Sequence, residues 1–185
     1  KKELEQQVIL RKKANDKVEY LATHDVLTGL ANRAILKAQI DSSCANAKRR
    51  DKKVALLFID LDSFKPINDL YSHEAGDYVL KTIAQRLLSC VREMDTVVRY
   101  GGDEFIILLP DLDNTEAVQQ TAERVINNVI TDINWRGKTL NVTASIGVAI
   151  YPETVNTTDM LIMGADNAMY EAKDNGKNRI VFFSA

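Results

Sequence analysis

The stretch RYGGDEFIILLP, residues 99–110, combines a tight turn, two adjacent acids and an apolar run. The pair Gly101-Gly102 predicts a β-hairpin turn, because glycine reaches positive φ without a steric cost. The apolar run 105–109 predicts a buried strand. Neither feature explains Asp103 and Glu104, whose neighbouring negative charges repel each other. We therefore expect a positive charge close to these two carboxylates.

The rest of the chain alternates strands and helices around this hairpin. The hairpin strands are expected at 95–100 and 104–109, and Asn32 is expected to cap the first helix of the domain. Further strands are expected at 52–62, 138–150 and 179–183, and helices at 33–50, 64–71, 76–91, 114–131 and 157–174. This order predicts an α/β fold in which helices flank a mixed central sheet, related to ferredoxin-like folds.

Residues 1–22 contain neither Gly nor Pro and predict a charged linker helix, ahead of a single domain at 23–185. A heptad seam runs through Leu4, Val8, Arg11, Asn15, Val18 and Ala22. Two interpretations remain open. The segment is either a solvated helix that packs back on its own domain, or the end of a parallel dimeric coiled coil leading from an upstream sensor domain. In a coil, a buried Asn pair would fix the register.

Composition narrows the class of protein. The 185 residues, of which 45% are hydrophobic, suit one domain with a sizeable core. A net charge of −2 gives no general attraction to nucleic acid. Cys44 and Cys90 form no CxxC motif or disulfide framework, as expected in a reducing cytoplasm. No apolar run approaches the ~18 residues of a membrane span. Since the chain opens without Met, we expect a cytoplasmic piece of a longer protein, and membrane anchoring of that parent stays open.

A second acidic cluster predicts where the positive charge belongs. Asp60 ends the apolar strand ALLFID, the position at which open α/β sheets place ligand sites. If this strand neighbours the hairpin, then Asp60 and the hairpin carboxylates converge. Mg²⁺ is typically bound by one or two carboxylates together with substrate phosphates. The alternative is that these acids only terminate strands and turns, but their combination with the Gly-Gly turn favours a metal site.

Five segments, in this order, carry a family resemblance: HDVLTGLANR (24–33), FIDLDSFKPINDLYSHEAGDYVL (58–80), RYGGDEF (99–105), SIGVAIYP (145–152) and ADNAMYEAKDNGKNR (165–179). They resemble the blocks of the GGDEF family of diguanylate cyclases, over residues 24–183. The resemblance implies the palm fold of nucleotide cyclases. It also implies condensation of two GTP molecules into cyclic di-GMP with release of two pyrophosphates. Because each domain would hold one GTP, it implies a homodimer with two domains facing each other.

The resemblance implies a divalent metal centre with two ions per active site, Mg²⁺ or alternatively Mn²⁺. Asp60 and Asp103 match its ligand positions, and the carbonyl of Leu61 matches a backbone ligand. Strand periodicity alone would also nominate Asp62, which shares a face with Asp60. The family pattern favours Asp60.

The remaining positions of the turn are implied in catalysis. Glu104 matches a residue that positions metal or accepts the proton of the attacking 3′-hydroxyl. Gly101 and Gly102 would let phosphate approach the backbone, because a Cβ there would obstruct it. The implied reaction is an in-line attack on the α-phosphate, in which two ions stabilise the attacking and leaving oxygens.

Substrate binding is implied for a wider set of residues. Asn68 and Asp77 match the guanine-binding positions, and a carboxylate suits guanine because N1–H and the 2-amino group are both donors. Without the resemblance, both residues would read as helix caps. The positions implied to lie around the bound GTP are Phe64, Lys65, Lys173 and Lys177.

The chain departs from the family pattern at two positions. Ser72 stands where the family usually has Gly before His, which is expected to shift that turn slightly. Lys177 stands where the family usually has Arg. A lysine keeps the charge but loses the bidentate fork, so we expect a weaker grip on phosphate.

Arg92 and Asp95 form an RxxD motif placed as in the family's product-inhibition site, which implies that cyclic di-GMP acts as an allosteric inhibitor. Arg124 resembles a second arginine that would reach this product from a neighbouring domain. Alone, Arg92 would be explained by the helix dipole.

Two other functions stay open. One is a catalytically silent module that binds GTP for regulation, against which the intact Gly101–Glu104 run and Asp60 argue. The other is a dimerisation module, supported by the N-terminal helix alone.

Overall fold

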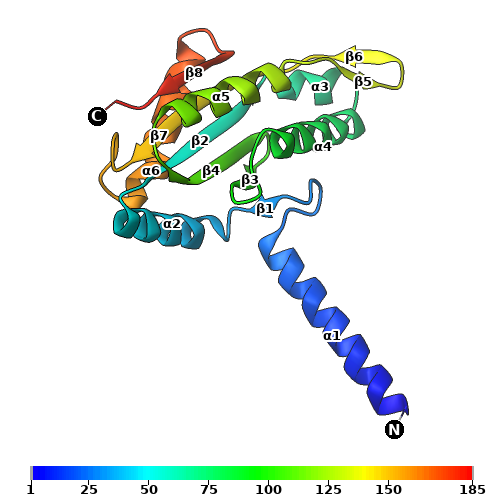
Figure 1. The fold of residues 1–185 in the computed structure, drawn as a ribbon. Helices are drawn as coiled ribbons and strands as arrows, with labels where there is room; N and C mark the ends of the chain where they lie inside the picture. The colour runs from blue at the N-terminus through cyan, green and yellow to red at the C-terminus, as the bar shows by residue number, and fades with distance from the viewer. Residues whose placement is uncertain (1, 185) are drawn as a thin grey trace.

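The computed structural model describes residues 2–184, and within the first helix the side chains of residues 6, 7 and 9–23. That helix, α1 (Lys2–Thr23), projects away from the rest of the molecule (Figure 1). The other elements are β1 (Ala31–Asn32), α2 (Leu36–Arg50), β2 (Lys53–Asp62), α3 (Phe64–Leu70), α4 (His73–Ser89), β3 (Thr96–Gly101), β4 (Glu104–Leu112), α5 (Glu116–Val129), β5 (Ile133–Trp135), β6 (Lys138–Leu140), β7 (Thr143–Tyr151), α6 (Thr158–Asp174) and β8 (Arg179–Phe182).

A six-stranded mixed sheet with the order β1-β3-β4-β2-β7-β8 forms the centre of the domain. The strand β2 pairs antiparallel with β4 and β7, whereas β1 and β8 pair parallel with β3 and β7. Every residue of β2 after Lys53 is buried, which explains its continuous apolar run. The predicted fold class, a mixed α/β sheet flanked by helices, is confirmed.

Helices cover both faces of the sheet (Figure 1). On one face, Leu57 and Ile59 of β2 pack with α4 and α5. On the other face, Leu56 and Phe58 pack with α2 and α6. Gly147 in β7 lets α6 approach closely, because a Cβ there would lie 1.9 Å from the Ala165 carbonyl oxygen. The last turn of α6 is thereby held against the end of the sheet that carries Asp60.

The predicted strand 138–150 is wrong in its first part. Lys138–Leu140 forms β6 and pairs with β5 in a separate two-stranded sheet. The reason is the turn between them: Arg136 and Gly137 both have positive φ, 48° and 77°, as a tight two-residue hairpin requires. The strand of the main sheet begins only at Thr143.

Two helix starts also differ from the prediction. The helix expected from residue 33 begins at Leu36, and Asn32 does not cap it but lies in β1, a strand that was not predicted. The helix expected from residue 76 begins at His73, because the Ser72 hydroxyl accepts a hydrogen bond from the Ala75 amide. Ser72 has extended backbone angles that any residue adopts, so this departure from the family pattern supplies a helix cap.

The helix α1 does not pack back on the domain. Its side chains at residues 9–22 are exposed, including the seam positions Arg11, Asn15 and Val18, whereas Leu4 and Val8 lie outside the described side chains. Its last turn is nevertheless anchored, since the Asn32 side-chain amide donates to the Ala22 carbonyl at 3.0 Å. None of the helices in the described part of the chain is long and apolar enough to cross a bilayer.

Candidate active site

The predicted carboxylates meet where β2 ends beside the β3–β4 hairpin. Asp60 is paired in register with Glu104 of β4. Asp103 precedes Glu104 in the turn, and its backbone carbonyl accepts a hydrogen bond from the Leu61 amide at 3.2 Å. A strand residue that bonds its antiparallel neighbour directs both its N–H and its C=O at it, so the Leu61 carbonyl also faces this turn. The convergence predicted from the sequence is confirmed.

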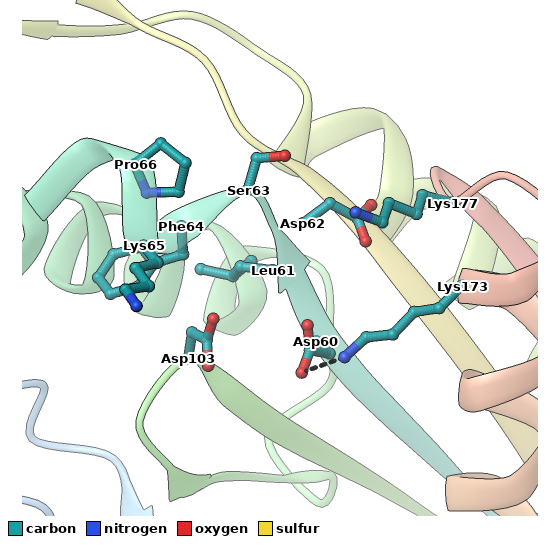
Figure 2. Close-up of a pocket in the computed structure, with 10 residues that line it drawn as sticks. All are labelled: Asp60, Leu61, Asp62, Ser63, Phe64, Lys65, Pro66, Asp103, Lys173 and Lys177. Atoms are coloured by element: carbon teal, nitrogen blue, oxygen red, sulfur yellow. Dashed lines mark ion pairs between the residues drawn. The ribbon is translucent and has the colours of Figure 1, made fainter. Parts of the chain in front are cut away.

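A pocket of about 340 Å³ opens at this point (Figure 2). It is lined by Asp60, Leu61, Asp62, Ser63, Phe64, Lys65, Pro66, Asp103, Lys173 and Lys177. The pocket therefore brings together all three predicted metal ligands and four of the predicted nucleotide-binding residues. Glu104, Asn68 and Asp77 are not among its lining residues.

Lys173 reaches from α6 and forms an ion pair with Asp60, drawn as a dashed line in Figure 2. Its Nζ lies 2.8 Å from Asp60 Oδ2, and the two side chains are 29% and 11% exposed. Burial raises the pKa of Asp60 and outweighs the opposing hydrogen bond from Lys173, while the charge of Asp103 raises it further. Burial lowers the pKa of Lys173, but the hydrogen bond and charge of Asp60 outweigh that effect and raise it. The ammonium of Lys173 thus partly balances the negative charges of Asp60, Asp103 and Glu104.

Asp62 has a different environment from Asp60, although both lie on the same face of β2. Its carboxylate accepts hydrogen bonds from the hydroxyls of Thr143 and Ser145, both at 2.7 Å, and from the Asn178 amide at 3.1 Å. These bonds satisfy Asp62 within the protein. Asp62 therefore fixes the α6–β8 loop to β2, which agrees with the preference for Asp60 as the metal ligand.

The turn Gly101–Glu104, called the acidic turn below, leaves open space around its glycines. A Cβ added to Gly101 or Gly102 would meet no atom within 4 Å, so the packing inside the domain requires neither glycine. Gly102 has a φ of 48°, a conformation in which a side chain is strained. Both glycines thus border open space, and their role in the approach of phosphate stays a prediction.

Two residues that the sequence analysis passed over hold the acidic turn in place. Arg99 donates to the Gly102 carbonyl from Nε and Nη2, at 3.1 and 2.8 Å, and from Nη1 to both carboxylate oxygens of Asp25, at 3.1 Å. Asp25 in turn accepts from the amide and the hydroxyl of Thr28. A useful signal was available, because Asp25 and Thr28 have the three-residue spacing at which a side-chain oxygen caps a following amide. Arg99 also lies just before the hairpin tip.

Glu104 is half-buried and faces the same side of the sheet as its cross-strand partner Asp60. Burial raises the pKa of Glu104, and the charges of Asp60, Asp103 and Asp166 raise it further, with a smaller opposing effect from Lys173. A carboxyl group with a raised pKa is a better proton acceptor than an ordinary surface glutamate.

The predicted guanine-binding residues lie on α3 and α4, beside the pocket. Asn68 packs over Gly76, where a Cβ would lie 1.9 Å from Asn68 Oδ1. Asp77 is exposed one residue further along α4. Since Ser72 caps α4 and Tyr71 ends α3, neither Asn68 nor Asp77 serves as a helix cap.

Lys177 lies in the loop that follows α6 and lines the pocket, and Figure 2 shows its side chain extending toward Asp62. Gly176, Lys177 and Asn178 all have positive φ, at 107°, 62° and 46°. This unusual backbone is held by the hydrogen bond from the Asn178 amide to Asp62. The side chain of Lys177 is therefore presented by a constrained loop.

The RxxD pair lies in a separate pocket of about 180 Å³ beside the far end of β4. Arg92 donates to Asp95 from Nε and Nη2 at 3.2 and 2.8 Å, and the Asp95 side chain is 2% exposed. Arg124 lines the same pocket of the same domain and donates to the Cys90 carbonyl at 2.7 and 3.0 Å. Arg124 thus lies beside Arg92 within one domain, and its contact with product bound to a neighbouring domain stays a prediction.

The sequence matches a protein-family model over most of its length. A family model described as "Diguanylate cyclase, GGDEF domain" matches residues 22–179. The chain belongs to the GGDEF family. This GGDEF domain is 39% identical over 173 residues to the bifunctional diguanylate cyclase/cyclic di-GMP phosphodiesterase MucR of Pseudomonas aeruginosa, a match covering 94% of the chain and 25% of MucR. The chain thus spans a quarter of that relative.

Solved structures agree with the family assignment. The GGDEF domain of TpbB from P. aeruginosa superposes with a TM-score of 0.85 at 38% identity, covering 87% of this chain and 94% of that one. The coiled coil and GGDEF domain of DgcB from Caulobacter crescentus, in complex with c-di-GMP, gives 0.87 at 27% identity, covering 97% and 95%. The fold predicted from the sequence is confirmed by both.

Proposed function

We propose that this GGDEF domain is an active diguanylate cyclase that condenses two GTP molecules into cyclic di-GMP and releases two pyrophosphates. The observation that carries the proposal is the alignment of Asp60 with Glu104, with Asp103 in the adjoining turn and Lys173 in the same pocket. This arrangement offers carboxylates for metal ions and ammonium groups for a triphosphate. The domain would act in the cytoplasm and would not bind nucleic acid. Its parent protein would carry an upstream sensor domain.

The donor set at the pocket fits a hard divalent ion. No group of three or more His, Cys, Asp or Glu side chains forms a complete cage within the described residues. Mg²⁺ does not need one, because it usually keeps one or two carboxylates and takes its other ligands from water and substrate phosphates. Asp60, Asp103 and the Leu61 carbonyl would hold two Mg²⁺ ions, or Mn²⁺ in their place. Such ions would stabilise the attacking and leaving oxygens of the transferred phosphate.

The protein groups around these ligands have separate tasks in this proposal. Glu104, with its raised pKa, would accept the proton of the attacking 3′-hydroxyl. Lys173 and Lys177 would bind the triphosphate, with Lys65 and Phe64 at the other wall of the pocket. Guanine would be bound between α3 and α4, where Asp77 can accept from N1–H and the 2-amino group, and Asn68 completes the recognition.

Two copies of the domain would be needed for each product molecule. Each pocket would hold one GTP, so both new bonds require two domains facing each other as an isologous pair. The free-standing helix α1 supports this arrangement, because its exposed seam is available to a second copy in a parallel coil. The DgcB structure likewise comprises a coiled coil and a GGDEF domain.

The second pocket would give the enzyme product inhibition. Arg92 and Arg124 line it together, and a guanidinium fork suits both phosphate oxygens and the acceptor edge of guanine. Cyclic di-GMP bound there would hold domains in an arrangement unable to react. The alternative function is a silent GTP-binding module, against which the complete set of acidic residues argues.

Incubation of the purified chain with GTP and Mg²⁺ tests the proposal. Chromatography should show cyclic di-GMP and pyrophosphate in a ratio of one to two, and Asp103→Ala should form neither. Binding of GTP without any product, at protein concentrations that give dimers, would favour the silent module.

A further inference from the structure

The ammonium of Lys173 lies where the sequence analysis expected a positive charge. Its Nζ contacts Asp60 Oδ2 at 2.8 Å, and Figure 2 shows it reaching Asp60 from the side opposite to Asp103. The charges of Asp103 and Glu104 also act on it, since both raise the pKa of Lys173. The protein therefore brings its own cation to one of the predicted metal ligands.

The contact is built into the fold. Gly147 allows α6 to touch the backbone of β7, which fixes the helix turn that carries Lys173. The neighbouring acid, Asp62, is already satisfied by Thr143, Ser145 and the Asn178 amide. Among the acids of the pocket, Asp60 is thus the one that Lys173 neutralises directly, and its side chain is 11% exposed.

An ammonium group and a metal ion compete for the charge of the same carboxylate. The ion pair leaves Asp60 Oδ1 free to coordinate a metal, but Lys173 already balances much of the charge of Asp60. Two positive charges at one carboxylate also repel each other in a half-buried pocket. A divalent ion therefore binds Asp60 more weakly while Lys173 keeps its contact.

We infer that Lys173 is a built-in counter-ion that keeps divalent metal weakly bound until a nucleotide arrives. The triphosphate would offer Lys173 another anionic partner, and the full charge of Asp60 would then be available to the metal. Each ligand lowers the cost of binding the other, so metal and nucleotide bind with positive coupling. The inference rests on the proposed role of Asp60 as a metal ligand, but it does not require turnover.

Binding of Mn²⁺ alone, followed by electron paramagnetic resonance without nucleotide, tests the inference. Lys173→Met removes the ammonium and keeps a side chain of similar length. It should bind Mn²⁺ about tenfold more tightly than the parent, equivalent to ~1.4 kcal/mol. Lys177→Met is the matched control, because it removes one positive charge from the same pocket without a contact to Asp60. An equal gain in both variants would mean that general electrostatics explains the effect, and would overturn the inference.

Two further variants test whether Asp60 is the metal ligand and whether loss of folding explains the result. The double variant Asp60→Asn with Lys173→Met should lose the gain in Mn²⁺ affinity, and a gain that survives would exclude Asp60 as the contested ligand. If Lys173→Met proves unfolded by circular dichroism, Lys173→Gln replaces it in the same comparison. Adding a non-hydrolysable GTP analogue should tighten Mn²⁺ binding in the parent about tenfold more than in Lys173→Met, since that variant has no ammonium to release.

The outcomes separate this inference from the proposed function. Absence of Mn²⁺ binding in every variant, with or without the analogue, would overturn the metal assignment and the inference together. The expected gain in Lys173→Met, combined with a parent that forms no cyclic di-GMP, would support the counter-ion and overturn the cyclase proposal.

Discussion

Replacing Asp25 by Asn tests whether the acidic turn depends on the ion pair between Asp25 and Arg99. Both hydrogen bonds from Thr28 go to Oδ1, which an asparagine oxygen can keep, whereas the second oxygen and the charge facing Arg99 are lost. The Arg99 and Asp25 side chains are only 15% and 23% exposed, so the pair is poorly screened by solvent. A hydrogen bond between charged groups contributes about 1.5–3 kcal/mol. We expect a loss near the lower end of that range, because Asn retains one contact with Arg99.

Two measurements check this expectation. Urea denaturation should show the loss in the free energy of unfolding directly. Thermal denaturation should show it as a lower Tm, because in a chain of this size each 1 kcal/mol lowers Tm by about 2–4 °C. The initial rate of cyclic di-GMP formation should fall as well, since Arg99 also holds the Gly102 carbonyl. Asp159→Asn is the matched control, because its ion pair with Lys37 is exposed on both sides and, screened by solvent, should contribute little to stability. Unchanged stability and rate in Asp25→Asn would refute the reasoning.

The remaining predictions concern the chemistry, assembly and regulation of the domain. Asp60→Ala and Asp103→Ala should each abolish turnover with circular dichroism unchanged, and normal synthesis at ordinary Mg²⁺ would contradict the metal assignment. Activity should rise more steeply than linearly with enzyme concentration, whereas strict proportionality in a monomeric sample would argue against a shared site. Arg92→Ala should weaken cyclic di-GMP binding at least about tenfold while initial rates stay near those of the parent, and identical inhibition curves would exclude the second pocket. Burial raises the pKa of Asp25, but hydrogen bonds from Thr28 and Arg99 outweigh burial and lower it. The contribution of Asp25 to the free energy of unfolding is therefore present above the unfolded value near pH 3.9. It is lost as the pH falls through the lower pKa of the folded state. The stability gap between the parent and Asp25→Asn should therefore close below about pH 4, and a gap that persists in acid would assign it to packing.

The convergence of the acidic residues was predictable because each lies at the end of an apolar strand. A continuous apolar run such as 54–61 indicates a strand covered on both faces, and such a strand belongs in the middle of a sheet. If the hairpin 95–109 lay beside that strand, Asp60 and the hairpin carboxylates would meet, and the pairing register shows that they do.

Other features depend on tertiary contacts that no local pattern carries. The division of 138–150 between two sheets follows from the positive φ of Arg136, which few non-glycine residues adopt. Arg124 of α5 donates to the Cys90 carbonyl, and this contact depends on how α5 packs against the end of α4. The ion pair of Lys173 joins residues 60 and 173, and required the close approach of α6 that Gly147 permits.

The helix α1 behaves mechanically as a rod attached at one end. Its 22 residues extend about 33 Å, so a sideways shift of ~3 Å at the far end tilts it by only about 5°. At its base the Asn32 side chain holds the Ala22 carbonyl, β1 lies beside β3, and Arg99 joins Asp25 to the tip of the hairpin. These contacts connect the base of the rod to the acidic turn without a break.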